Sequence, residues 1–100
     1  MNESHIIGSR SIIGDKVRST EGDDLGEIKE LLIDSETGRI EYGVLSFGGF
    51  MGMGEKQIAV PFESFIYQED DKYFELNVDK EVLENASTQI DYQGKSYYIY

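Results

Sequence analysis

The chain has 100 residues, enough for one domain with a single hydrophobic core. Apolar residues make up 39% and aromatic residues 12% of the sequence, which excludes a disordered acidic chain. The 20 acidic and 9 basic side chains are spread evenly and give a net charge of −11, which argues against DNA, RNA or a bare anionic membrane as a direct partner.

The sequence has no cysteine, so the fold cannot depend on disulfides, a thiolate zinc site or a cysteine nucleophile. The first nine residues lack the basic and apolar segments of a signal peptide. No apolar run approaches the ~20 residues that a membrane span requires. We therefore expect a cytoplasmic protein without membrane insertion.

The first third of the chain predicts a leader and two strands. Residues 1–10 are polar and mixed, which is typical of a flexible leader. Apolar residues around Gly14 predict a bent strand within residues 11–20. Residues 21–26 have the composition of a hairpin turn, and residues 27–34 follow. The apolar residues of 27–34 also fit one face of a helix. Turn residues on both sides, however, limit this segment to the length of a strand, so we predict a second, antiparallel strand.

The middle of the chain continues as strands and tight turns. Residues 39–47 are the clearest predicted strand, because their pattern alternates and β-branched and aromatic side chains are frequent. A glycine-rich segment at 48–54 separates them from an extended run at 56–60, which leads to the only proline, expected at a strand end or edge. Two further strands, at 64–68 and 73–78, flank an acidic hairpin tip.

The last third predicts a short helix and a tyrosine-rich extension. Asp79 is expected to cap a helix near residues 79–86. Residues 88–100 follow as an extension that can add a strand. The short links between five to six strands predict an all-β fold with an antiparallel sheet. Closing it into a small, strongly bent β-barrel would remove exposed edges and enclose the core.

Several motifs then occur in a familiar order. They are Ile33-Asp34, Glu36-Thr37-Gly38-Arg39-Ile40, Val44-Leu45-Ser46, the loop Gly48-Gly49-Phe50-x-Gly52-x-Gly54-Glu55-Lys56, and Ile58-Ala59-Val60-Pro61-Phe62. The opening Ile13-Gly14-x-x-Val17, the pair Leu25-Gly26 and the late Asp79-Lys80-Glu81-x-Leu83-x-Asn85-Ala86 agree with them. Over roughly residues 10–87 the chain thus resembles the PRC-barrel family.

The resemblance implies a small bent barrel at residues 11–87 that acts as an interaction module and is no enzyme. Barrels of this family occur in the cytoplasmic part of the photosynthetic reaction-centre H subunit and in ribosome maturation factors of the RimM type. They also occur as free-standing proteins, some of them linked to cell division. We expect a free-standing member, because the chain has neither a membrane span nor room for the domain that precedes the barrel in the ribosome factor.

Other motifs give weaker indications of chemistry. Residues 49–56 spell G-x-x-x-x-G-E-K, close to a phosphate-binding loop, but Glu55 interrupts the motif and a strand follows instead of a helix. His5 is alone in the leader, without an orienting partner for catalysis. The acidic turns at 23–24 and 69–71 lack the spacing of a calcium-binding loop. We expect no catalytic residues, no cofactor and no metal site.

The residues predicted to contact a partner belong to two segments. They are Phe50, Met51 and Met53 in the glycine-rich segment, and Tyr92, Tyr97, Tyr98 and Tyr100 in the extension. The first group either forms an adaptable hydrophobic surface or plugs the barrel mouth. The tyrosines either contact a second subunit or a ligand, or cover the core of their own chain. The outer edge of 64–68 or of 92–100 can also extend a sheet across two copies.

Three functions stay open at the level of the sequence. The main hypothesis is a non-enzymatic adaptor that binds a protein partner and forms a homodimer, without direct contact to nucleic acid. The second is a ribosome maturation or RNA-processing accessory factor that contacts a basic ribosomal protein. The third is a small-ligand or metal-binding domain.

Overall fold

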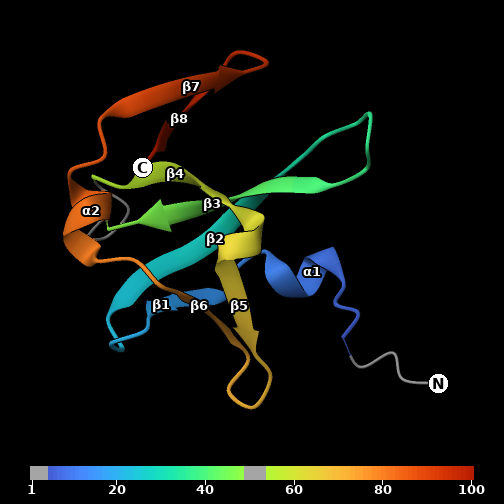
Figure 1. The fold of residues 1–100 in the computed structure, drawn as a ribbon, viewed down its shortest axis with the longest axis vertical. Coiled ribbons are helices and arrows are strands. Elements are labelled where there is room, and N and C mark those ends of the chain that lie inside the picture. Colours follow the sequence, from blue (N-terminus) through green and yellow to red (C-terminus); the bar gives the residue numbers. More distant parts are fainter. Residues whose placement is uncertain (1–4, 49–53) are drawn as a thin grey trace.

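A computed structural model describes residues 5–48 and 54–100 of the chain. They form one sheet of eight strands in the order β5-β6-β1-β2-β3-β4-β8-β7, with two short α-helices (Figure 1). The elements are α1 (Ser9–Ile12), β1 (Lys16–Ser19), β2 (Asp24–Ile33), β3 (Ile40–Phe47), β4 (Lys56–Pro61), η1, a 3-10 turn (Phe62–Ser64), β5 (Phe65–Gln68), β6 (Tyr73–Leu76), α2 (Lys80–Glu84), β7 (Thr88–Tyr92) and β8 (Lys95–Ile99). The mostly β fold and the short helix near residues 79–86 are confirmed.

The predicted barrel of five to six antiparallel strands is wrong in its details. The described residues contain eight strands, and two of the pairings, β1 with β6 and β4 with β8, are parallel. Each parallel pair joins strands that lie far apart in the sequence, so the short links between successive strands do not forbid it. The sheet is also not closed into a barrel, because β5 and β7 are its two edges.

The sheet nevertheless curls so strongly that its first strands fold over the core. A Cβ atom at Gly43 on β3 would lie 2.8 Å from the ring of Phe65 on β5, although three strands separate β5 from β3 within the sheet. The corner lies where β4 ends at Pro61 and the chain turns through η1 into β5. The curled sheet encloses the main core. Its buried members are Ile12, Val17, Leu25, Ile28, Leu45, Phe47, Ile58, Val60, Phe65, Phe74, Leu76 and Leu83.

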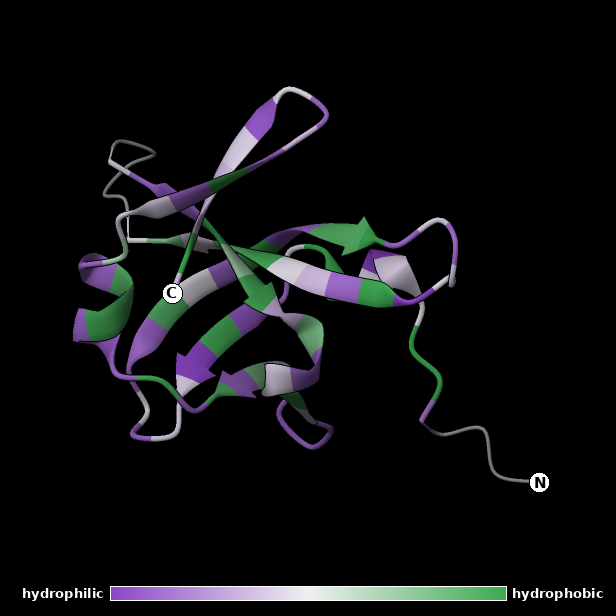
Figure 2. Cartoon of the chain, turned by 45° about the horizontal axis from the view of Figure 1, so that its top comes forward, coloured by the Kyte–Doolittle hydropathy of each residue, from purple (hydrophilic) through white to green (hydrophobic). Residues whose placement is uncertain are grey.

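Apolar and polar residues alternate along the strands, as the green and purple bands of Figure 2 show. Successive side chains of a strand point to opposite faces, which places Leu45 in the main core and Val44 on the other face of β3, in a second cluster. On β2 the register shifts between Ile28 and Glu30, which is a bulge that increases the local twist. Leu32 then packs against the second cluster.

The C-terminal hairpin of β7 and β8 covers the second cluster. Its two-residue turn is Gln93-Gly94, both with positive φ, which matches the twist of an antiparallel hairpin. Alternation along β8 directs Tyr97 to the second cluster and Tyr98 to the main core. The hairpin is joined to the rest of the sheet by the parallel ladder that pairs Ile58 with Tyr98. Neither described α-helix is long and apolar enough to cross a membrane.

Candidate functional site

A groove of about 740 Å³ lies between two hairpins, β2–β3 and β7–β8. Both hairpins extend toward the same side of the molecule (Figure 1). The first hairpin lines the groove with residues 30–35, Glu41 and Tyr42. The second hairpin lines it with Tyr92, Gln93, Lys95 and Tyr97. Its volume lies within the range of about 300–1,000 Å³ that is typical of binding sites.

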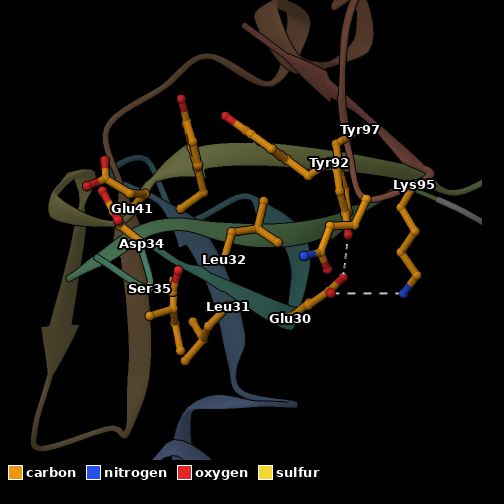
Figure 3. A pocket seen from close by; sticks show the side chains of 12 residues that line it. Glu30, Leu31, Leu32, Asp34, Ser35, Glu41, Tyr92, Lys95 and Tyr97 are labelled. Atoms are coloured by element: carbon orange, nitrogen blue, oxygen red, sulfur yellow. Dashed lines mark hydrogen bonds and ion pairs between the residues drawn. The ribbon is translucent and has the colours of Figure 1, made fainter. Parts of the chain in front are cut away.

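At the inner end of the groove, Glu30 joins the two hairpins. The Tyr97 hydroxyl donates a hydrogen bond of 2.9 Å to Glu30 Oε1, and the Lys95 ammonium lies 3.9 Å from Glu30 Oε2 (Figure 3). The Tyr97 side chain is only 4% exposed. Burial, and after it the hydrogen bond and charge of Glu30, raise the pKa of the Tyr97 hydroxyl. The phenol therefore stays neutral and acts as a donor at neutral pH.

The outer end of the groove combines two tyrosine rings with two carboxylates. The ring centroids of Tyr42 and Tyr92 are 6.2 Å apart, with the planes tilted by 40°, and Tyr92 is 44% exposed. Asp34 and Glu41 lie close together and away from Glu30 (Figure 3). The Tyr42 side chain as hydrogen-bond partner, then burial and the charges of Tyr42 and Glu41, raise the pKa of Tyr92.

The charge of the groove is predominantly negative. Three carboxylates, those of Glu30, Asp34 and Glu41, line it with one ammonium group, which belongs to Lys95 and is paired with Glu30. Residues 5–48 and 54–100 hold no group of three or more His, Cys, Asp or Glu side chains that could bind a metal ion. The groove therefore suits cationic, apolar and aromatic groups better than anions.

The structure places the seven predicted contact residues in different surroundings. Phe50, Met51 and Met53 lie outside the described residues. Among the tyrosines, Tyr92 and Tyr97 both line the groove. The other two differ. Tyr98 packs against the main core, and Tyr100 is exposed. Whether any of the seven contacts a partner stays a prediction.

The lysine of the glycine-rich motif has an intramolecular role. The Lys56 ammonium donates to the carbonyl oxygens of Glu84 at 2.6 Å and Ala86 at 2.9 Å, at the C-terminal end of α2. It also lies 5.0 Å from the centroid of the Tyr98 ring. The motif leads into strand β4 and not into a helix. Lys56 thus stabilises the end of a helix, a role that requires no phosphate.

Sequence interpretation missed the groove residues on β2 and β3. In the sequence these residues resemble ordinary strand and turn residues; they are Glu30, Asp34, Glu41 and Tyr42. They line a groove only because the C-terminal hairpin packs beside them. One local signal was present. Gly94 stands between two strand-like runs, 88–92 and 95–99, and glycine is a turn residue.

Comparisons with known proteins identify the family of the chain and a similar fold. The model of the PRC-barrel domain matches residues 5–83, so β7 and β8 lie beyond it. No curated protein matches the sequence. A solved structure of a 16S ribosomal RNA processing protein, RimM, from Pseudomonas aeruginosa has a similar fold, with 15% identity and a TM-score of 0.51.

That likeness covers 81% of this chain and 50% of the other, so this chain spans half the length of the solved protein. At 15% identity it shows the fold alone. The family match over residues 5–83 includes α1, all strands from β1 to β6, and most of α2. The protein belongs to the PRC-barrel domain family.

Proposed function

We propose that this protein is a non-enzymatic, cytoplasmic interaction module that binds a protein partner in the groove between the β2–β3 and β7–β8 hairpins. The observation behind the proposal is the groove itself. It offers Ile33, which is 60% exposed, and Tyr92 beside unpaired carboxylates. Tyrosine is enriched at protein interfaces, and the buried centre of an interface is more apolar than its rim.

The charge favours a partner with a basic surface. The chain carries −11 overall, and three of the four charged groove residues are acidic. A positive protein surface would associate quickly with such a site, whereas a phosphate backbone would be repelled. We therefore propose a protein partner and no direct contact with nucleic acid.

Self-association is the second part of the proposal. Strands β5 and β7 form the sheet edges, and β5 contains neither lysine nor proline to protect it. Ile66 on β5 is also exposed. Such an edge is suited to pairing with the same strand of a second copy, which would give a homodimer. The molar mass measured by light scattering tests this, and a monomer at all concentrations would remove the dimer from the proposal.

The groove is tested by affinity purification of the tagged protein from its own cells. We expect the double variant Ile33→Ser with Tyr92→Ala to lose most of the recovered partner. Val82→Ser is the matched control, because Val82 is an exposed aliphatic residue on α2, which contributes no side chain to the groove. Equal recovery with a folded groove variant would contradict the groove as the site. A parallel variant, Phe50→Ser with Met53→Ser, tests the glycine-rich segment.

A ribosome-associated role is the alternative, favoured by the similar fold of the RimM structure. In this hypothesis the acidic surface contacts a basic ribosomal protein. Co-sedimentation with ribosomal particles at low salt, weakening as salt rises, is the expected result. The absence of co-sedimentation even at low salt would remove this alternative and leave the adaptor proposal intact.

A further inference from the structure

We infer that the groove is a docking site for an extended basic segment of the partner and that its outer end binds an arginine side chain. The inference rests on the proposed function and adds the chemistry of the bound residue. The arginine subsite is defined by Tyr42, Tyr92, Asp34 and Glu41, which come from both hairpins and the turn after β2.

The two tyrosines provide the face on which a guanidinium group can lie. Their centroids are 6.2 Å apart, and Tyr92 keeps 44% of its surface exposed, so an incoming side chain can reach the rings. This chain already uses the same interaction twice, with Arg18 lying 5.1 Å from the Tyr73 centroid and Lys56 5.0 Å from that of Tyr98. Within residues 5–48 and 54–100, no cation lies over Tyr42 or Tyr92.

The carboxylates provide the complementary charge. The ion pairs in the described ranges involve Glu27, Glu30 and Glu69 and leave Asp34 and Glu41 without a cationic partner. Residues 1–4 and 49–53 contain no lysine or arginine. Asp34 is held in place, because its Oδ1 accepts the backbone N–H of Glu36 at 2.9 Å. Asp34 and Glu41 are therefore the groove carboxylates without a cationic partner, and the charge of Glu41 acts on Tyr92, while Glu30 is occupied by Lys95 and Tyr97.

Arginine fits this arrangement better than lysine. Its planar guanidinium group stacks on an aromatic face and still directs N–H donors sideways to carboxylates, whereas an ammonium group is a more strongly hydrated point charge. A groove of about 740 Å³ between two hairpins also accommodates several side chains of an extended segment. The neighbouring Leu32 and Ile33 offer contact area to apolar residues beside the arginine.

The probe for this inference is an N-acetylated, C-amidated Gly-Arg repeat peptide with four arginines, titrated into the full chain by calorimetry and NMR. Peptides with lysine or with uncharged citrulline in place of arginine are the comparisons. We expect arginine to bind more tightly than lysine and citrulline to show no binding. The shifted resonances should include Tyr42 and Tyr92. Citrulline binding as tight as arginine binding would overturn the inference.

Two variants separate the subsite from general charge attraction. Glu41→Gln and Tyr92→Leu should each weaken arginine-peptide binding about three- to tenfold. Glu81→Gln on α2 removes the same charge from an exposed position whose side chain does not line the groove, and should change binding less than twofold. Equal losses for Glu41→Gln and Glu81→Gln would overturn the subsite.

The same variants distinguish this inference from the proposed function. If the cellular partner is lost with Ile33→Ser and Tyr92→Ala but is retained by both Glu41→Gln and Tyr92→Leu, the groove binds a partner without an arginine subsite. If the groove variants all retain the partner, the proposed function itself fails at this site. Loss of the partner with Glu41→Gln and retention with Glu81→Gln supports both.

Discussion

The Tyr97 hydroxyl is a polar group on a side chain that otherwise packs against Val44 and Ala59. Its hydrogen bond to Glu30 links the C-terminal hairpin to β2. We expect Tyr97→Phe to lower the free energy of unfolding by about 1–2 kcal/mol, since Glu30 is half-exposed and water partly replaces the lost donor. Urea unfolding at pH 7 measures this. Tyr100→Phe, at an exposed position, is the control and should be near neutral.

Because the pKa of Tyr97 is raised, the contribution of Tyr97 to the free energy of unfolding depends on pH. The pKa in the folded state, raised by burial and then by Glu30, exceeds the value of about 10 in the unfolded chain. The stabilisation is therefore complete below about pH 10 and is lost as the pH rises through the folded pKa. The difference in unfolding free energy between wild type and Tyr97→Phe should be constant from pH 7 to 9 and shrink above pH 10. A difference that grows above pH 10 would contradict this.

The fold requires glycine at position 26. Its φ is +126°, and a Cβ atom would overlap the backbone carbonyl oxygen of Ser46 on the neighbouring strand. We expect Gly26→Ala to cost about 2–4 kcal/mol, because the backbone conformation and the close approach both oppose it. Gly22→Ala isolates the first effect, since Gly22 has φ +92° but open space around it, and should cost only about 1 kcal/mol. Equal costs would remove the steric argument.

At the level of elements, Lys56 connects β4, the end of α2 and β8. Asp79 stands at the N-cap position of α2, but its side chain makes no capping hydrogen bond, so the lysine at the other end is the main polar anchor of this five-residue helix. We expect Lys56→Met to cost about 1–3 kcal/mol, because carbonyl oxygens of α2 lose a charged donor. Lys80→Met in the first turn is the control and should be nearly neutral. Thermal unfolding followed by circular dichroism compares the two.

Elements with a strong local pattern were predictable from the sequence. The alternating pattern of 39–47 corresponds to β3, and the turn residues around 27–34 correctly favoured a strand over a helix there. The hairpin of β5 and β6 and the end of β4 at Pro61 also agree. Each of these rests on a periodicity or a turn within about ten residues, which is the range over which side-chain patterns determine local structure.

The remaining features depend on contacts between distant segments. Parallel pairing of Val17 with Phe74 and of Ile58 with Tyr98 leaves no local signature, because each strand is equally compatible with other neighbours. Helix α1 has only four residues, too few for a helical period. The candidate site combines residues 30–42 with residues 92–97. These segments are too far apart in the sequence for a local pattern to show that they form one site. Only Tyr92 and Tyr97 were selected beforehand, for their residue type.

For the molecule as a whole, the charge of −11 should oppose the compact state. Raising NaCl from about 20 to 500 mM should screen this repulsion and raise the unfolding midpoint by about 5 °C, which corresponds to roughly 1 kcal/mol for a domain of this size. The effect should be smaller at pH 5, where part of the carboxylates is protonated. Magnesium chloride of equal ionic strength should give a similar shift, and a much larger one would indicate a cation site.

The parallel ladder between β4 and β8 has a consequence for how the chain is made. Ala59 pairs with Ile99, which is synthesised 40 residues later. At ~5–20 residues per second, the edge of β4 therefore waits about 2–8 s for its neighbour. During that interval β5, β6 and α2, which complete the main core, are themselves being synthesised, and Val44 and Ala59 are uncovered. A nascent chain at this stage exposes an unpaired strand edge, which can bind chaperones or other nascent chains on the same messenger RNA.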